Sequence, residues 1–222
     1  MQRLTETALE KSDTGNFTLM EVARWSGGSS DRQFALLKRA LKSGEVMRIH
    51  HGLYCLASKY LRRKPDPLVL AQQIHGPSYI SLESALSYHG WIPEAVYAVT
   101  SASMDRSREF ETPLGHFSFT RIPQKVFYTE VARIEKEGGG RNEQGFHAVE
   151  SFLMASPLKA LADYVYAHRL DWVSVGPVIE SLRVDESSLA GIKVETFERL
   201  LTNYSSARVR RFLEGLRKDL NR

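Results

Sequence analysis

The sequence predicts an α+β protein with two domains, residues 1–62 and residues 63–222. Three observations lead to this class. Two helix-start signals and a hairpin pattern come early, strand-like runs separated by turn residues fill the middle, and apolar residues recur at helical spacing near the end. We therefore expect a small helical domain with a hairpin, followed by a mixed α/β domain with a helical C-terminus.

The composition is that of a globular protein, with 42% hydrophobic and 25% charged residues. The single cysteine, Cys55, excludes an internal disulfide and a cysteine-based zinc site, as is usual in a reducing compartment. The N-terminus shows no apolar signal segment, and no later run approaches the roughly 18 to 20 apolar residues of a membrane span. We expect a cytoplasmic protein with no membrane partner.

Charge is distributed unevenly along the chain, although the net charge is only +4. Residues 1–64 hold 12 Lys and Arg against 6 Asp and Glu, whereas residues 65–192 hold 10 against 16 and residues 193–222 hold 8 against 4. A basic N-terminal unit on an acidic body predicts a polyanionic partner for that end. A basic surface that is only solvated is the alternative that charge alone leaves open.

Two capping-box patterns predict two helices that begin twelve residues apart. The hydroxyl of Thr18 or Ser30 accepts from an amide three residues on. The side chain of Glu21 or Gln33 then reaches back to the cap amide. The glycines at 27–28 permit the positive φ of a tight turn between the helices. This spacing is that of a helix-turn-helix.

The second helix separates apolar from basic residues when it is projected at about 100° per residue. The predicted core face consists of Phe34, Leu36, Leu37, Ala40 and Leu41. The opposite arc consists of Arg32, Ala35, Lys38, Arg39 and Lys42. All four basic residues of this helix therefore face one way.

A β-hairpin is predicted directly after the basic helix, where the runs VMRIH and LYCLA flank a His-Gly pair. Glycine at the second turn position allows the primed geometry that two-residue hairpins favour. Alternation of period two places Met47 and Ile49 inward. The same alternation leaves Arg48 and His50 outward.

A basic helix followed by a hairpin with outward Arg and His is the geometry of a recognition helix and a wing. We therefore expect residues 1–62 to form a winged helix-turn-helix domain that binds double-stranded DNA. The major groove is wide enough to admit the helix, while the wing contacts the neighbouring phosphate backbone. The alternative is an inert small domain whose charged helix face is solvated.

The rest of the chain predicts alternating helices and strands after a basic, proline-interrupted stretch at 59–67. Asp66 and Pro67 begin a helix that ends near Ile74, and Ser81 caps a second helix that stops at Gly90. The expected strands cover residues 78–80, 95–102, 108–113, 116–122 and 126–134.

The last third of the chain is predicted to be mostly helical. The glycine-rich stretch 135–145 is expected to be a flexible hairpin tip. Ser156 and Pro157 then open a helix, and two more helices are expected near residues 194–203 and 207–220.

Candidate catalytic and metal-binding residues do not form a usable set, so we expect no catalytic residue, no metal site, no cofactor and no enzymatic activity. His147 and Glu150 have no third ligand at a recognisable spacing, and the adjacent His50 and His51 cannot point the same way on a hairpin.

One arrangement resembles the acidic-plus-lysine layout of many nucleases. It combines Asp66 with the later Glu135 and Lys136. Asp66 has a simpler role as a helix cap, and Glu135 falls in the expected flexible tip. A nuclease is therefore the weakest of the functions that the sequence leaves open.

Three stretches together resemble a known family: HGLY at residues 51–54, YISLESALSYHGWIPE at 79–94 and ASPLKALADYVY at 155–166. Their order, over nearly the whole chain, is similar to that of the AbiEi-type abortive-infection antitoxins of type IV toxin–antitoxin systems. The resemblance implies a winged-helix transcriptional regulator that represses its own promoter by binding operator DNA. It also implies a C-terminal domain that counteracts a nucleotidyltransferase-like toxin, directly or indirectly.

Carried over residue by residue, the resemblance places the DNA contacts on ten side chains. On the helix and the turn before it these are Ser29, Ser30, Arg32, Gln33, Lys38, Arg39 and Lys42. On the wing they are Arg48, His50 and His51. Leu158 departs from the charged residue expected in a PxKAL context, which argues against a surface role for that helix start. The alternative function is a winged-helix regulator whose acidic C-terminal domain senses a ligand or a partner.

Overall fold

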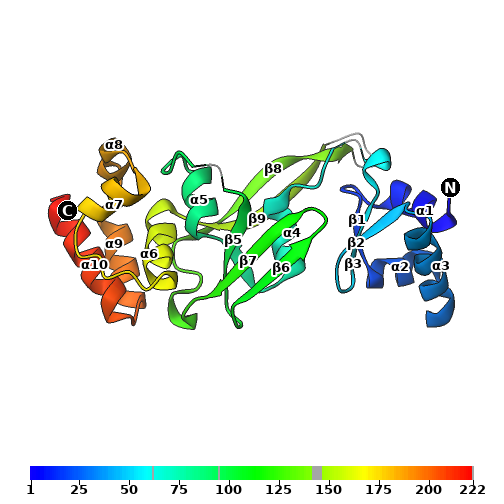
Figure 1. Cartoon of the computed structure of the whole chain (residues 1–222), viewed down its shortest axis with the longest axis horizontal. Coiled ribbons are helices and arrows are strands. Elements are labelled where there is room, and N and C mark those ends of the chain that lie inside the picture. Colours follow the sequence, from blue (N-terminus) through cyan, green and yellow to red (C-terminus); the bar gives the residue numbers. More distant parts are fainter. Residues whose placement is uncertain (62, 95, 142–146, 222) are drawn as a thin grey trace. The chain divides into compact units, whose positions relative to one another are not determined.

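The computed structural model describes residues 1–61, 63–94, 96–141 and 147–221, and the chain divides into two compact units (Figure 1). The first unit comprises Met1–Ile74, Thr112–Leu114 and Glu135–Ser151; the second comprises His75–Glu111, Gly115–Ile134 and Phe152–Arg222. Both units combine helices with β-sheet, which confirms the α+β class. In the described part of the chain, no helix has the length and apolar character needed to cross a membrane.

The first unit begins with three helices and a three-stranded sheet. In chain order the elements are α1 (Arg3–Lys11), β1 (Asn16–Thr18), α2 (Leu19–Ser26), α3 (Ser30–Lys42), β2 (Val46–His50) and β3 (Leu53–Leu56). Strand β3 lies between β1 and β2 and runs antiparallel to both. The predicted pair of helices and the hairpin are confirmed, and β1 adds a strand that the sequence did not indicate.

The start of α2 and the turn that follows it have the predicted local chemistry. Thr18 Oγ1 accepts from the Glu21 amide at 3.3 Å, and Glu21 Oε2 accepts from the Thr18 amide at 2.7 Å. Gly27 and Gly28 both take a positive φ, 58° and 76°, which glycine adopts without steric cost. The capping box of α2 and the tight turn between α2 and α3 are therefore confirmed.

One hydrophobic cluster holds these elements together, and all of its residues precede position 62. Its buried residues are Leu4, Ala8, Phe17, Val22, Leu37, Ala40, Val46, Tyr54 and Leu56. The Phe17 ring lies 5.6 Å from the Trp25 ring and 6.0 Å from the Tyr54 ring, measured between centroids. A Cβ at Gly15 would overlap the Leu61 side chain, so the absence of a side chain at this glycine leaves room for Leu61.

A six-stranded mixed sheet forms the centre of the remaining chain. The strands, in spatial order, are β6 (Arg108–Thr112), β7 (Gly115–Arg121), β5 (Ala98–Ser103), β4 (Ser78–Ile80), β9 (His147–Ala155) and β8 (Val131–Arg141). Strand β5 is parallel to β7 and antiparallel to β4, and β4 is parallel to β9.

Helices of the second unit pack on this sheet and on one another. They are α5 (Leu82–Tyr88), α6 (Pro157–Ala167), α7 (Gly176–Leu182), α8 (Glu186–Ala190), α9 (Val194–Asn203) and α10 (Ala207–Asp219). Helix α5 packs on β5 and α6, and α10 packs on α6 and α9. Helix α6 starts as predicted, because Ser156 Oγ accepts from the Lys159 amide at 3.4 Å. At Gly215 in α10 a Cβ would overlap the Val173 carbonyl, so glycine permits this close approach.

Two expectations about the strands are wrong. Residues 126–130 are not strand, because Gln124–Val126 form a short 3-10 helix and residues 127–130 form a turn. Val126 and Phe127 are both fully buried, which a turn allows and a one-sided strand does not. Strand β8 also continues to Arg141, so the predicted flexible stretch 135–145 is strand up to that residue, and its residues 142–146 lie outside the described residues.

A buried polar network in the second unit centres on the carboxylate of Asp163 in α6. Asp163 Oδ1 accepts from Lys159 Nζ at 2.5 Å and from the Tyr204 hydroxyl. Asp163 Oδ2 accepts from the Tyr79 hydroxyl at 2.8 Å and from Ser81 Oγ at 2.7 Å. The side chains of Lys159 and Asp163 are both 0% exposed. The ion pair is thus fully buried, with its carboxylate saturated by four donors.

Burial changes the ionisation of the groups around Asp163. It lowers the pKa of the Lys159 ammonium and raises the pKa values of the Tyr79 and Tyr204 hydroxyls. The ammonium also lies 5.4 Å and 5.0 Å from the centroids of the Tyr79 and Tyr204 rings, within cation–π range. Ser81 occupies the N-cap position of α5 but donates its hydroxyl to Asp163, so its predicted side-chain cap is wrong.

We expect residues 1–62 to fold alone, because their hydrophobic cluster takes no residue from beyond position 61, with a stability of at most about 3 to 5 kcal/mol. Residues 63–222 should fold separately. Far-UV circular dichroism and urea unfolding of the two pieces check both expectations. A 1–62 piece without a cooperative unfolding transition would show that the predicted boundary after residue 62 is too early.

Asp163→Asn should lower the free energy of unfolding of the second unit by about 3 to 5 kcal/mol, because it leaves the Lys159 ammonium buried without a counter-charge. The double variant Lys159→Met with Asp163→Asn should recover part of this loss, since it buries no net charge. Urea unfolding followed by tryptophan fluorescence measures both variants. Equal unfolding of Asp163→Asn and the parent would contradict a structural role for the pair.

Candidate nucleic-acid interface

Helix α3 begins one residue earlier than its sequence pattern suggests. Ser29 is the N-cap, and its hydroxyl accepts from the Arg32 amide at 3.4 Å. The capping box predicted at Ser30 is therefore wrong. With the cap at Ser29, the third helical position is Arg32 and not Gln33, whose side-chain Nε2 instead donates to the Gly28 carbonyl at 3.2 Å. The Arg32 side chain also lies against Gly28.

The basic residues of α3 lie on its exposed face, as predicted. Leu37 and Ala40 are buried in the cluster, whereas Lys38, Arg39 and Lys42 are exposed. Arg39 Nε donates to the Ala35 carbonyl within the helix at 3.2 Å. Lys38 and Lys42 form no hydrogen bond or ion pair with any residue that the structure describes. Their charges are thus available to an external anion.

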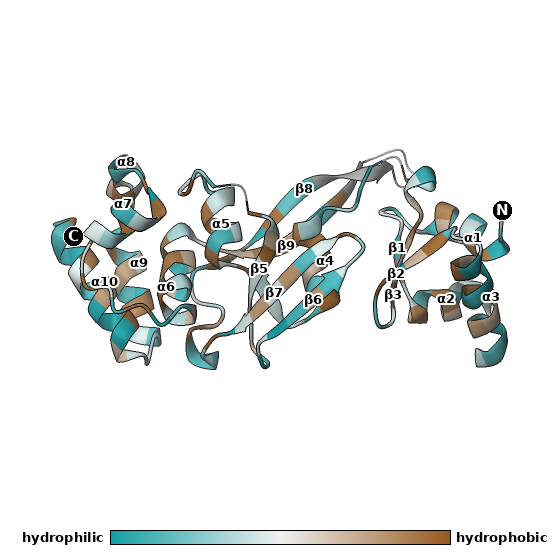
Figure 2. Ribbon diagram, viewed as in Figure 1, coloured by the Kyte–Doolittle hydropathy of each residue, from teal (hydrophilic) through white to brown (hydrophobic). Residues whose placement is uncertain are grey.

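Hydrophilic residues recur along both α3 and α10 (Figure 2). The arginines near the C-terminus, however, have carboxylate partners. Arg208 and Arg211 both lie near Asp171, at 3.1 Å and 3.8 Å, and Arg217 lies 3.5 Å from Glu198. None of the α3 cations forms an ion pair within the described ranges. The basic residues of α3 therefore differ from these three arginines, because they lack a carboxylate partner among the described residues.

The hairpin after α3 brings Arg48, His50 and His51 to one end of the first unit's sheet. Arg48 and His51 are exposed, while His50 is half-buried. Arg48 Nε lies 3.4 Å from the His50 carbonyl. The hairpin that carries these three residues follows α3 directly in the chain, so it is the next element with basic side chains.

The turn geometry predicted for the hairpin is wrong. Only Gly52 of the two turn residues has a positive φ, 78°, whereas a primed turn needs one at the first turn position. Arg48 pairs with Tyr54 and His50 with Leu53, so Ile49 is an extra residue that forms a β-bulge. The bulge accommodates the turn and still leaves Ile49 buried and Arg48 exposed, as expected.

Phe34 corrects the predicted core face of α3, because its side chain is 53% exposed. Leu36, Leu37 and Leu41 already cover the cluster, and Phe34 lies at the edge of their arc. Phe34 precedes Lys38 by one helical turn. Sequence reasoning assigned it to the core because it is apolar; its angular distance from Leu36 was the signal that it lies at the border.

The residues considered for a nuclease, Asp66, Glu135 and Lys136, lie elsewhere in the first unit, and Asp66 and Lys136 are bonded to each other. Asp66 Oδ1 accepts from the Leu68 amide at 2.8 Å at the start of α4 (Pro67–Ile74), which confirms its role as a cap. Asp66 Oδ2 accepts from Lys136 Nζ at 3.0 Å. Arg63 and Glu150 form a second pair at 3.1 Å, and burial raises the pKa of the Glu150 carboxyl.

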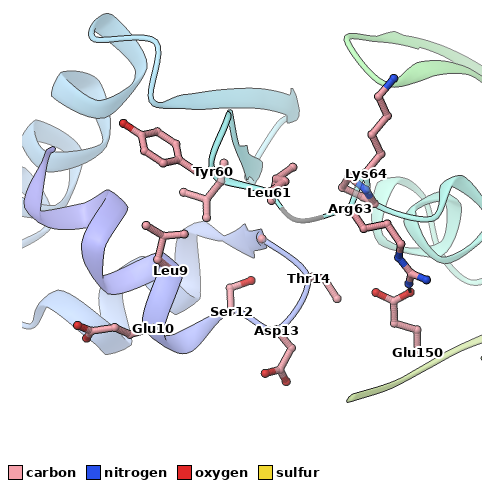
Figure 3. Close-up of a pocket in the computed structure, with 13 residues that line it drawn as sticks. Leu9, Glu10, Ser12, Asp13, Thr14, Tyr60, Leu61, Arg63, Lys64 and Glu150 are labelled. Carbon is pink, nitrogen blue, oxygen red and sulfur yellow. Dashed lines mark hydrogen bonds and ion pairs between the residues drawn. The ribbon is translucent and has the colours of Figure 1, made fainter. Parts of the chain in front are cut away.

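A pocket of about 470 Å³ lies beside this second pair, and Figure 3 shows Arg63 reaching toward Glu150 while Lys64 extends away from it. Of the hydroxyls labelled there, Ser12 Oγ donates to the Asn16 carbonyl at 2.7 Å and Thr14 Oγ1 accepts from the Asn16 amide at 3.3 Å, so neither is bonded to a general base. Burial raises the pKa of the Cys55 thiol to about 11, so this residue is a poor nucleophile. No cluster of three or more metal-ligating side chains occurs among the described residues.

Ser29→Ala should destabilise the first unit by about 0.5 to 1 kcal/mol, because it removes the side-chain acceptor for the Arg32 amide. Ser30→Ala is the matched control, and it should be neutral within about 0.5 kcal/mol because Ser30 lies inside the helix. Thermal unfolding of the two variants measures the difference. If Ser30→Ala were the more destabilising of the two variants, Ser30 and not Ser29 would be the N-cap.

In comparisons with known proteins, neither a protein-family model nor a curated protein matches the chain.

Proposed function

We propose that residues 1–62 form a winged helix-turn-helix domain that binds operator DNA, with α3 as the recognition helix. The observation that carries this proposal is the exposed face of α3, where Lys38 and Lys42 lack any carboxylate partner among the described residues. Exposed, unpaired cations on one helix face are suited to neutralising phosphates. The same helix follows a three-residue turn after α2, as in a helix-turn-helix.

The order of elements also supports a winged helix. Helix, strand, two helices and a two-stranded hairpin follow one another, and β1 completes the sheet beside β3. The hairpin with Arg48 and His51 exposed is then the wing. Arg32 and Gln33 contact Gly28 in the free protein, so binding of bases requires rotamer changes of the kind common at interfaces.

We further propose that the chain is an antitoxin of a type IV toxin–antitoxin system that represses its own promoter and counteracts a nucleotidyltransferase-like toxin. This part rests on the resemblance of residues 51–54, 79–94 and 155–166. The proposal includes a cytoplasmic location and no enzymatic activity. The Asp66 carboxylate is occupied by the Leu68 amide and by Lys136, which favours this absence of activity over a nuclease.

A transcriptional regulator with a ligand-sensing second unit is the alternative, and one observation favours it. The second unit contains a pocket of about 700 Å³ lined by the Tyr128 ring, Met154 and Pro157, with His89 and Arg199 as polar groups. A pocket of this size, mainly apolar with a few polar groups, is typical of small-molecule sites.

The proposed function is tested by selecting duplexes from a random library with the full chain and asking whether one sequence is enriched. That sequence should occur upstream of the chain's own gene, and a nucleotidyltransferase-like gene should lie beside it. Co-expression with that neighbour should restore growth in the antitoxin case. Enrichment without growth rescue would support the regulator, and absence of enrichment would overturn both.

Two kinds of residue on α3 and the wing should lose binding in different ways. Arg32→Ala or Gln33→Ala should cost about 1 to 3 kcal/mol on the selected duplex and little on random DNA, because base contacts exist only where the sequence matches. Lys42→Ala or Arg48→Ala should weaken both duplexes equally. Each should also reduce the slope of log K against log salt by about 0.9, since one fewer counterion is released.

Arg211→Ala is the matched control for these charge deletions, because Arg211 is exposed but lies 3.8 Å from Asp171. Its salt slope should equal that of the parent. Fluorescence anisotropy titrations at several salt concentrations measure all five variants. If Arg32→Ala and Lys42→Ala weaken selected and random duplexes in the same proportion, α3 is a nonspecific basic surface.

A further inference from the structure

The side chain of Phe34 is an exposed apolar feature of α3 that phosphate binding does not explain. It is 53% exposed on a helix whose other exposed side chains are polar, basic or as small as Ala35. Ser30 lies one helical turn before it and Lys38 one turn after it, so Phe34 occupies the middle of an exposed row. Leaving a phenylalanine half in water forgoes the stabilisation that its burial supplies.

The floor of a DNA major groove offers very few apolar groups. Base edges present hydrogen-bond donors and acceptors, and the apolar exception in unmodified DNA is the C5-methyl group of thymine. The same methyl position is occupied in 5-methylcytosine. A row that places a phenylalanine between a serine and an unpaired lysine therefore has the chemistry to read a methylated pyrimidine next to polar base edges and phosphates.

We propose that Phe34 is a specificity-determining residue that packs against the C5-methyl group of one pyrimidine in each bound site. This inference rests on the proposed DNA-binding function and adds the base feature that is read. The exposed charges of α3 are four basic residues against one acidic residue, Asp31, and this balance favours DNA over a protein partner as the occupant. Lys38 and Lys42 have no carboxylate partner among the described residues, which fits a polyanion better than an apolar protein surface.

The experiment uses the full chain and the duplex selected from the random library. Each thymine is replaced in turn by deoxyuridine, which removes only the methyl group, and each cytosine is replaced in turn by 5-methylcytosine. Kd is measured by fluorescence anisotropy for the parent, for Phe34→Ala and for the control Met20→Ala. Met20 is 78% exposed on α2, so the control also removes an exposed apolar side chain.

We expect one thymine per site at which deoxyuridine weakens binding by the parent about 4-fold, the value of one buried methyl group. Phe34→Ala should bind the intact duplex more weakly and respond less than about 2-fold to the same replacement, whereas Met20→Ala should keep the full response. Tighter binding at a 5-methylcytosine, with no sensitive thymine, would identify that base as the source of the methyl group. Circular dichroism and thermal unfolding should show that Phe34→Ala remains folded.

The outcomes separate this inference from the function on which it rests. If no duplex is enriched, the DNA-binding function fails and the role of Phe34 fails with it. If a duplex is bound selectively but no methyl replacement changes the parent's Kd, only the role of Phe34 is overturned. The role of Phe34 is also overturned if the Phe34→Ala variant keeps the methyl response. The same holds if the parent self-associates in a concentration-dependent way and the variant does not, because Phe34 would then contact a second copy of the chain.

Discussion

The buried carboxylate of Asp163 is the constraint on which the second unit depends. An ionised carboxylate removed from water costs several kcal/mol unless charge and hydrogen bonds replace its hydration. Lys159 supplies the charge, and hydroxyls from Ser81, Tyr79 and Tyr204 supply the bonds. These donors come from β4, from the turn into α5, from α6 and from the residue that follows α9. Because hydrogen bonds are directional, these four donors fix the elements that carry them relative to one another.

The same network brings together residues from two distant stretches of the sequence. Tyr79 and Ser81 belong to the stretch 79–94, and Lys159 and Asp163 belong to the stretch 155–166. Two stretches far apart in the sequence therefore meet around one carboxylate. The side chains of Tyr79, Ser81, Lys159 and Asp163 are all buried, so these polar residues serve the interior of the second unit and are not part of an exposed catalytic or binding surface.

The basic residues of α3 and those of α10 differ in whether carboxylates lie beside them. Arg208, Arg211 and Arg217 lie within 4 Å of carboxylates of their own unit, so part of their charge is already neutralised. Lys38 and Lys42 on α3 have no such partner among the described residues, and they keep their full attraction for phosphate. Net charge alone could not distinguish these regions. The placement of carboxylates around each helix makes the difference.

The sequence by itself determined the local elements. The capping box at Thr18, the glycine turn and the apolar period of α3 are signals carried by neighbouring residues, and they predicted both helices. The strand-like runs on either side of His51 and Gly52 predicted the hairpin in the same way. Tertiary structure decided what depends on distant partners. The Ser81 hydroxyl does not cap α5 because it donates to Asp163. Phe34 is exposed because Leu36, Leu37 and Leu41 of the same helix already fill the space above the cluster. Hydrogen-bond partners and available core volume are properties of the assembled chain, so local patterns predicted the helices that carry these residues but not their contacts or their burial.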